Sequence, residues 1–474
     1  MSREGVWKSG VAWQGPEVTL AAPEAAIAGL DGGAFATVSA PQKRGLLLGS
    51  RDAPAVFHRV SPKARRADPH DTACLMSEAS SRRFEARRRL PSTILLLGLT
   101  SLFTDIGTEM IFPLLPVFLV ETLHAGPDYL GLIEGAADTV ASLLKLVSGV
   151  IADRMRERKS LVFFGYALAS AVRPLVAIAT RPWHVLAVRV TDRIGKGIRG
   201  APRDALIADT AGSRSGSAFG FNQAMDNVGA VVGPLLATGL VALHWPLRRV
   251  FLIALVPGVV ATALVGMVRE TPSARSTPRS ASGRAFSPSR GLALYLAILI
   301  VFSLGNSSDA FLLLRARSLG LSTAAIPVLW GVLNISKVLW TYAGGEWADR
   351  VPKPALIAGG WFVYAGVYLG LARAGALWEV WALFVAYGAF YGLTEPVEKA
   401  LVRDLAAVDQ RGAAYGAYNF VIGISALPAG ILMGSVWRVW GAAAALSMGA
   451  SLAMLSCILL LVWSAGRSKW APPS

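Results

Sequence analysis

The sequence predicts an all-α membrane protein in which twelve transmembrane helices form two pseudo-symmetric six-helix bundles. Three observations support this fold class: apolar residues come in long blocks, basic residues gather in alternate loops between the blocks, and the two halves share short patterns. Of the 474 residues, 54% are hydrophobic and only 16% are charged. Blocks of about 20 apolar residues match the hydrocarbon core of a bilayer. The backbone must satisfy its own hydrogen bonds inside that core, so such blocks form helices.

The apolar blocks follow one another along most of the chain. We predict spans at 94–120, 128–152, 161–180, 183–209, 216–243, 249–268, 291–314, 323–348, 355–374, 377–404, 414–438 and 441–464. Basic residues cluster after the even-numbered spans, among them Arg154, Arg156, Arg158, Lys159, Arg203, Arg214, Arg350, Lys353 and Arg411. Cytoplasmic loops of membrane proteins are enriched in Lys and Arg. The pattern predicts a multi-pass membrane protein with both termini in the cytoplasm. The formal net charge of +16 has the same origin, so no nucleic-acid partner is predicted.

Two segments differ in composition from the rest of the chain. Residues 1–90 are rich in Ala, Gly, Pro, Ser and Arg and contain no apolar stretch suited to a signal peptide. We predict a disordered cytoplasmic extension there, with a coding start at Met76 as the alternative. Residues 269–290 are rich in Ser, Pro and Arg and predict a flexible basic cytoplasmic linker. The remaining parts are the two bundles and a cytoplasmic tail, at 91–268, 291–465 and 466–474.

The two halves contain matching patterns at nearly the same spacing. Gly149-Val-Ile-Ala-Asp153-Arg154 ends the second span, and Gly345-Glu-Trp-Ala-Asp349-Arg350 ends the eighth, about 196 positions later. The segments 205–209 and 400–404 correspond at about the same offset, as do 218–220 and 414–416. A duplicated six-span unit with a central linker explains these correspondences.

Three motifs resemble those of the major facilitator superfamily of transporters. The segment from Gly149 to Lys159 resembles its loop signature after the second helix, and the segment from Arg193 to Gly197 resembles its fourth-helix signature. The segment from Gly229 to Pro234 is similar to a fifth-helix motif common in its exporters. The resemblance covers about 90–465 and implies two bundles that alternate access to a central site. Residues 192–204 and 304–311 also resemble a bacterial subgroup of this superfamily, whose substrate the residues do not name. This resemblance implies a location in the bacterial inner membrane.

No cofactor, metal or enzyme site is predicted. Gly195-Lys-Gly197-Ile-Arg-Gly200 fits a dinucleotide-binding pattern, but that pattern requires a preceding strand, and an apolar span precedes it here. The five histidines are scattered along loops and margins, which argues against a paired-histidine catalytic cluster. Cys74 and Cys457 lie far apart, so neither a disulfide nor a thiol metal site is indicated.

Two short motifs are predicted to act in gating and in helix packing. The Asp-Arg motif is expected to hold a cytoplasmic gate by bridging to charges of the adjacent bundle, through Gly149, Asp153, Arg154, Gly345, Asp349 and Arg350. The alternative is that Asp153 only caps or pairs at a helix end. In the fifth-helix motif, Gly229, Gly233 and Pro234 are expected to let helices approach closely or kink. The similarity of this motif to exporters favours export.

Charged residues inside the spans carry the functional prediction, because charges within a bilayer normally face a water-filled path and find partners. Asp105 and Glu109 are four residues apart and share one face of the first span. A carboxyl group in an apolar environment keeps its proton more readily than one in water. We therefore predict that both groups couple transport to protons, with a structural salt bridge to Lys145 as the alternative. Arg193 and Glu395 are assigned to the same coupling.

Other polar residues within the spans are assigned to substrate contact. They are Arg173, Lys196, Asn222, Asp226, Asn306, Asp309 and Glu398. Both signs of charge favour a polar, zwitterionic or anionic solute over a purely lipophilic drug. The amides could equally form hydrogen bonds between helices. Asn334 and Lys337 interrupt the eighth span in the same way, without an assigned role.

These residues predict a proton-linked transporter of a small organic solute. The first prediction is proton-coupled efflux by antiport, and the alternative is proton-coupled uptake of a polar or anionic metabolite by symport. A membrane receptor without transport is a minor alternative. The predicted partners are the solute, protons and the lipid bilayer, and the protein is expected to act as a monomer.

Overall fold

The computed structural model describes residues 90–154, 157–211, 215–270, 287–347, 350–407 and 410–466. Within these residues every predicted span is helical, which confirms the predicted fold class. Almost all of the predicted extension, most of the predicted linker and most of the predicted tail lie outside the described residues.

The first half of the chain contributes six helical spans to the described residues. The first span begins as α2 (Ser92–Ile111) and continues through η1 (Phe112–Leu114), α3 (Leu115–Val117) and η2 (Phe118–Thr122). The others are α4 (Pro127–Arg154), α5 (Lys159–Val172) with η3 (Arg173–Ile178), α6 (Pro182–Ala211), α7 (Ser215–Ala242), and α8 (Leu247–Ile253) with α9 (Leu255–Met267).

The second half likewise contributes six spans to the described residues. They are α10 (Arg290–Gly305) with α11 (Ala310–Ser318), α12 (Ala325–Trp347), α13 (Lys353–Arg373), α14 (Leu377–Leu405) and the two arms of α15 (Arg411–Ala465). The arms of α15 meet at Gly441, whose φ of 84° and ψ of 174° are not helical. Glycine adopts a positive φ without steric cost, so the chain turns there and both predicted spans are present.

The seventh span differs from its prediction because it is interrupted in the middle. The helix α10 ends at Gly305, and Asn306 adopts φ −91° and ψ 82°, outside the helical region. The helix resumes only at Ala310, after Asp309. An unwound segment inside a membrane is tolerated where it is surrounded by protein or lines a cavity.

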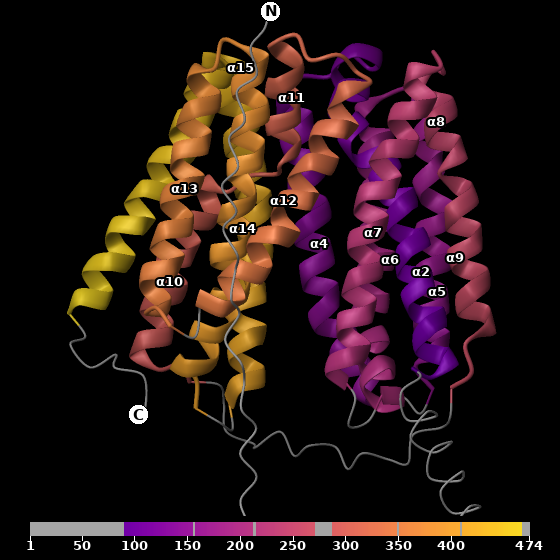
Figure 1. The fold of residues 1–474 in the computed structure, drawn as a ribbon, viewed down its shortest axis with the longest axis horizontal. Helices are drawn as coiled ribbons and strands as arrows, with labels where there is room; N and C mark the ends of the chain where they lie inside the picture. The colour runs from indigo at the N-terminus through magenta and orange to yellow at the C-terminus, as the bar shows by residue number, and fades with distance from the viewer. Residues whose placement is uncertain are drawn as a thin grey trace, which may run out of the picture. The chain divides into compact units, whose positions relative to one another are not determined.

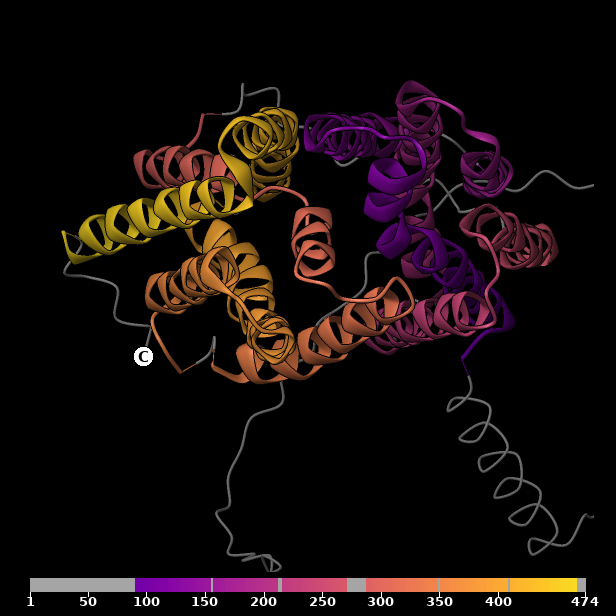
Figure 2. The same ribbon diagram turned by 90° about the horizontal axis from the view of Figure 1, so that it is seen from above.

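The helices pack as two groups that face each other (Figures 1 and 2). In the first group α2 packs on α7 and α9, and α6 packs on α4 and α5. In the second group α14 packs on α12 and α13, and α15 packs on α10 and α13. The most extensive contacts between the groups are those of α4 with α15 and of α7 with α12. The two groups therefore form equivalent bundles, as the repeat predicts.

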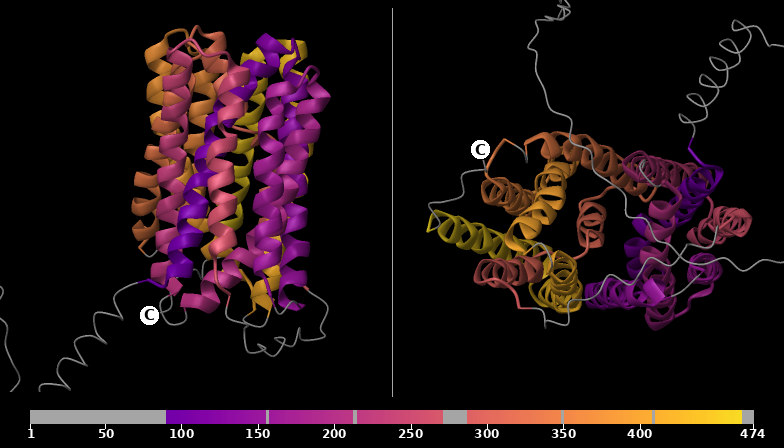
Figure 3. Two further views of the ribbon diagram at one scale, coloured as in Figure 1. Left: turned by 90° about the vertical axis from the view of Figure 1, so that its right-hand side faces the viewer. Right: turned by 90° about the horizontal axis from the view of Figure 1, so that it is seen from below.

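The bundles have two distinct ends, which Figures 1 and 3 show from several sides. We call the end that carries α8 the α8 end, and the end at which α9 finishes and α10 begins the linker end. At the α8 end, Arg317 Nε lies 2.6 Å from Glu121 Oε1, and Arg438 lies 3.4 Å from Asp128. Near mid-height, Thr139 donates a hydrogen bond of 2.7 Å to the carbonyl oxygen of Gly423. The bundles are thus joined from the middle of the helices to the α8 end.

Seven helical segments of the described residues are long and apolar enough to cross a membrane. The helices α4, α6, α12 and α14 carry more polar residues and are not among them. These four helices contribute to the walls of the cavities described below. Their lower hydropathy therefore reflects an inward polar face.

Candidate functional site

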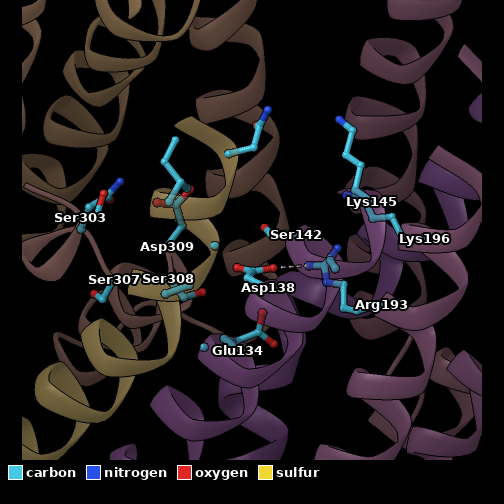
Figure 4. A pocket seen from close by; sticks show the side chains of 18 of the residues that line it. Glu134, Asp138, Ser142, Lys145, Arg193, Lys196, Ser303, Ser307, Ser308 and Asp309 are labelled. Carbon is cyan, nitrogen blue, oxygen red and sulfur yellow. Dashed lines mark ion pairs between the residues drawn. The ribbon is translucent and has the colours of Figure 1, made fainter. Parts of the chain in front are cut away.

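A polar cavity of about 450 Å³ lies between the two bundles (Figure 4). The helices α4 and α6 line it on one side, and the α10–α11 segment and α15 line it on the other. Its polar lining consists of Glu134, Asp138, Ser142, Lys145, Arg193, Lys196, Ser303, Asn306, Ser307, Ser308, Asp309, Tyr391 and Asn419. Small-molecule sites commonly measure about 300 to 1,000 Å³, so the cavity has the size of a binding site for a small solute.

On the second-bundle side, the break in the seventh span places Asp309 at the cavity wall. Its carboxylate accepts hydrogen bonds from the Tyr387 hydroxyl at 3.0 Å and from the Tyr391 hydroxyl at 2.6 Å. Lys337 Nζ lies 3.3 Å from the same carboxylate and 3.7 Å from the centroid of the Tyr391 ring. A cation over an aromatic ring is attracted by the ring electrons. Side chains of two helices, α12 and α14, therefore hold the Asp309 charge in place.

On the first-bundle side, charged residues of α6 are paired in a buried network. Arg189 makes two hydrogen bonds to Glu134, of 2.9 and 2.6 Å. Asp192 lies 3.8 Å from Arg189 and 2.8 Å from Arg173. Closer to the cavity, Arg193 lies 3.5 Å from Asp138, which is the ion pair drawn in Figure 4. Buried charges are tolerated when they are paired in this way.

A smaller chamber of about 220 Å³ lies beside the cavity. Its charged lining comes from Asp105, Glu109, Arg173, Asp192, Arg193, Lys196 and Arg199. Phe112, Arg193 and Lys196 line both spaces, so these three side chains lie where the chamber meets the cavity. The structure thus gathers Asp105, Glu109, Arg173, Arg193 and Lys196, which the sequence assigns to coupling and substrate contact.

Glu109 also joins the two bundles. Its carboxylate Oε2 accepts a hydrogen bond of 2.5 Å from the indole nitrogen of Trp330 on α12. Trp330 packs against Phe112 with ring centroids 5.0 Å apart, and Lys337 Nζ lies 4.9 Å from the Trp330 ring. The titratable carboxyl group of Glu109 therefore takes part in a contact between the bundles.

The fifth-helix motif lies directly behind the two carboxyl groups. A methyl group at Gly229 would lie 2.7 Å from the Leu102 carbonyl oxygen and 2.8 Å from Asp105 Cβ. At Gly233 it would lie 2.7 Å from the Ile106 carbonyl oxygen and 2.9 Å from Glu109 Cβ. Only glycine allows α7 to approach α2 this closely, and the predicted role of the motif in packing stays a prediction.

Other predicted site residues lie apart from these spaces. Asn222 accepts a hydrogen bond from Ser101 and donates one to Asp226, so this pair belongs to a contact between α2 and α7. Glu398 is buried within the second bundle and accepts hydrogen bonds from Trp361 and Tyr418. Glu395 is exposed, lies 3.2 Å from Lys399 and lines a second cavity of about 450 Å³ bordered by α7, α12 and α14.

The predicted gate residues lie at the linker end. Asp349 is outside the described residues, and Gly149, Asp153, Arg154 and Gly345 are described by their backbone alone. Arg350 is exposed after α12. The gate therefore stays a prediction.

Several residues of the site have no predicted role. Glu134 and Asp138 are four residues apart on α4, the same spacing that drew attention to Asp105 and Glu109. This spacing could have identified Glu134 and Asp138 as site residues. The charge of Lys337 in the middle of a span could have identified that residue. Trp330, Tyr387 and Tyr391 carry no comparable signal, because aromatic residues are ordinary in transmembrane spans.

Sequence comparisons assign the chain to a known family. The sequence pattern described as "Major Facilitator Superfamily" matches residues 97–427. An "Uncharacterized MFS-type transporter" of Methanocaldococcus jannaschii is 30% identical over 384 residues, which cover 80% of this chain and 96% of that protein. The "Multidrug resistance protein MdtH" of Cronobacter sakazakii is 23% identical over 327 residues, covering 68% of this chain and 80% of that protein.

Solved structures show the same fold. A crystal structure of the nucleoside transporter NupG aligns with a TM-score of 0.67 at 13% identity, covering 79% of this chain and 100% of that one. The POT family transporter PepTSo aligns with a TM-score of 0.66 at 13% identity, covering 81% and 100%. The chain matches the family pattern, aligns with almost the whole length of the Methanocaldococcus jannaschii relative and forms paired six-helix bundles. It therefore belongs to the major facilitator superfamily of membrane transporters.

Proposed function

We propose that this secondary transporter couples the movement of a small organic solute to protons, and that it exports the solute by antiport. The single observation that carries the coupling is the chamber in which Asp105 and Glu109 lie beside Lys196, with Glu109 bonded across the bundles to Trp330. The two bundles would rock about the cavity between them, opening it at one membrane face and then at the other.

A proton on Glu109 would act on the contact between the bundles. A hydrogen bond to an ionised carboxylate is roughly twice as strong as one between neutral groups. Protonation of Glu109 would therefore weaken its bond to Trp330 and change the relative stability of the states that contain and lack this contact. The same protonation would change the net charge of the chamber, which adjoins the solute cavity.

Export is supported by two observations. The fifth-helix motif, similar to one found in exporters, packs against the backbone that carries Asp105 and Glu109. In addition, one of the relatives is named as a multidrug resistance protein.

Uptake by symport is the second candidate, and the cations favour it. Lys145 and Lys196 line the cavity and have no ion-pair partner among the described residues. If Asp105 and Glu109 carry protons, these cations are left to attract an acidic solute, so proton and solute would bind together.

Proteoliposomes loaded with a pH-sensitive dye test both candidates. Amino acids, carboxylates, nucleosides and cationic drugs are added outside in turn, and the internal pH is recorded. Antiport predicts that an entering solute makes the interior more alkaline, and symport predicts that it becomes more acidic.

The variants Asp105→Asn and Glu109→Gln separate coupling from transport. Each should abolish the solute-driven pH change, whereas Glu379→Gln, which removes a carboxylate at the start of α14 outside the cavities, should leave it unchanged. Parent-like pH changes in both chamber variants would show that the coupling assignment is wrong.

A further inference from the structure

We propose that Arg193, Lys196 and Arg199 form a subsite for an acidic group of the transported solute, a carboxylate or a phosphate. This inference rests on the proposed transport of a small solute. The subsite itself requires neither direction of transport, but joint binding of a proton and an acidic solute would favour symport. It defines the chemical class of the solute more narrowly than the mixed charges of the cavity do.

Arg193, Lys196 and Arg199 have hydrogen-bond donors to spare, although Arg193 also lies 3.5 Å from Asp138. The neighbouring Arg173 and Arg189 are held by Asp192 and Glu134. In contrast, Arg199 is only 7% exposed, and its Nη1 has no hydrogen-bond partner among the described residues. The same is true of the buried Nε of Arg193. A buried charged donor without an acceptor is costly, so an anion that supplied one would be bound favourably.

The subsite can be reached from the main cavity. Lys196 lines both the chamber and the main cavity and makes no ion pair with the described residues. Arg199 lies deeper, with its guanidinium 4.2 Å from the centroid of the Tyr166 ring. An acidic group that entered from the cavity would meet Lys196 and Arg193 first and Arg199 next.

The opposite wall of the main cavity carries mainly hydroxyl and amide groups. Ser303, Asn306, Ser308 and Asn419 line the main cavity on the second-bundle side. Asp309 lies on the same wall, where Lys337 compensates its charge. Hydroxyl and amide groups bind neutral polar parts of a ligand. A solute with one acidic end and a polar, uncharged body would therefore contact both bundles at once, as the rocking of the bundles requires.

Anion binding at this subsite should depend on pH, because carboxyl groups line the same chamber. The charged and titratable groups that line the chamber or interact with its charges are Asp105 and Glu109 of α2, Arg173 of η3, Asp192 and Arg203 of α6, Asp138 of α4, Tyr166 of α5, Asp226 of α7 and Lys337 of α12. Ionised Asp105 and Glu109 would compete with the solute for Lys196. Protonation of either should therefore strengthen anion binding.

The test is direct binding of simple anions to the purified full chain. Sodium phosphate and sodium acetate are each titrated against sodium chloride at constant ionic strength, in a detergent without phosphate. Both the unfolding temperature and the heat of binding are recorded, and choline serves as a cationic comparison. We expect phosphate or acetate to bind and to raise the unfolding temperature, with a larger effect at lower pH, and whichever anion binds identifies the acidic group.

Matched variants locate the binding. Lys196→Gln should weaken anion binding about tenfold, because a bond to a charged group is lost. Lys196→Arg should retain it, and Lys399→Gln, which removes an exposed lysine elsewhere, should not change it. Arg199→Gln provides a second, deeper probe. The proposal is overturned if neither anion binds, or if Lys196→Gln and Arg199→Gln bind as tightly as the parent.

The binding result and the transport result can fail separately. Anion binding lost in Lys196→Gln, together with unaltered pH changes in Asp105→Asn and Glu109→Gln, would retain the subsite and reject the proton coupling. Intact coupling without any anion binding would retain the proton coupling and reject the subsite.

Discussion

Arg173 and Asp192 illustrate how single charged residues are accommodated in the first bundle. Their side chains come from η3 and α6, are 5% and 3% exposed, and meet at 2.8 Å. Arg173 also donates a hydrogen bond of 3.2 Å to the carbonyl oxygen of Thr104 on α2. One ion pair thus connects three helices, and it keeps the charge of Asp192 compensated behind the chamber.

We expect Arg173→Met to lower the free energy of unfolding by about 3 to 5 kcal/mol, because it leaves the buried Asp192 carboxylate without its main partner. The double variant Arg173→Met with Asp192→Asn should recover a large part of this loss. Arg438→Met removes an exposed partner of Asp128 and should change stability by at most about 1 kcal/mol. Thermal and chemical unfolding in detergent measure all three. If Arg173→Met were as stable as the double variant, Arg173 would not be the main partner of the Asp192 carboxylate.

At the scale of helices, the contact between α2 and α7 is the element that places the carboxyl groups. Gly229 and Gly233 are one turn apart on α7 and face the backbone of α2 at Asp105 and Glu109. The sequence predicts this packing, because small residues four apart form a flat strip on a helix. Any residue with a side chain at these positions would move α2 and, with it, the proposed proton site.

Gly233→Ala should therefore reduce proton-coupled transport strongly and destabilise the protein by about 1 to 3 kcal/mol through overpacking. Gly239→Ala is the matched control on the same helix, since a methyl group there meets no atom within 4 Å. The comparison uses unfolding temperature and the dye-loaded vesicle assay. Equal effects of the two variants would show that close approach of α7 and α2 is unimportant.

At the scale of the whole molecule, the contacts between the bundles are unevenly distributed. Arg317 with Glu121 and Arg438 with Asp128 join them at the α8 end, and Glu109 with Trp330 joins them further in. The main cavity lies on the other side of these contacts, between α4, α6, α10, α11 and α15. The described residues thus show a transporter whose cavity is closed toward the α8 end.

Loop charges predict that the linker end faces the cytoplasm. Single cysteines test this orientation in a background where Cys74 and Cys457 are replaced by serine. A membrane-impermeant maleimide should label Arg181→Cys, in the exposed loop before α6, in intact cells. It should label Glu157→Cys, in the exposed loop after α4, only after permeabilisation. The reverse pattern would place the linker end outside.

The sequence by itself determined the helical spans, their grouping into halves and most of the charged residues that line the smaller chamber. Apolar length and repeated patterns are properties of the chain, and they are independent of how the helices are turned. For the same reason Asp105, Glu109, Lys196 and Asp309 could be selected as charges within spans.

Only the tertiary structure decided which charges are paired and which remain available. Helical periodicity places residues on one face but leaves open the rotation of that helix and the neighbour it meets. Asp226 and Glu398 therefore proved to hydrogen-bond within packed contacts, and Lys337 proved to hold Asp309. The chamber of Asp105, Glu109 and Lys196 exists because α2, α6 and α12 meet there. This meeting depends on the packing of distant segments, which no local pattern encodes.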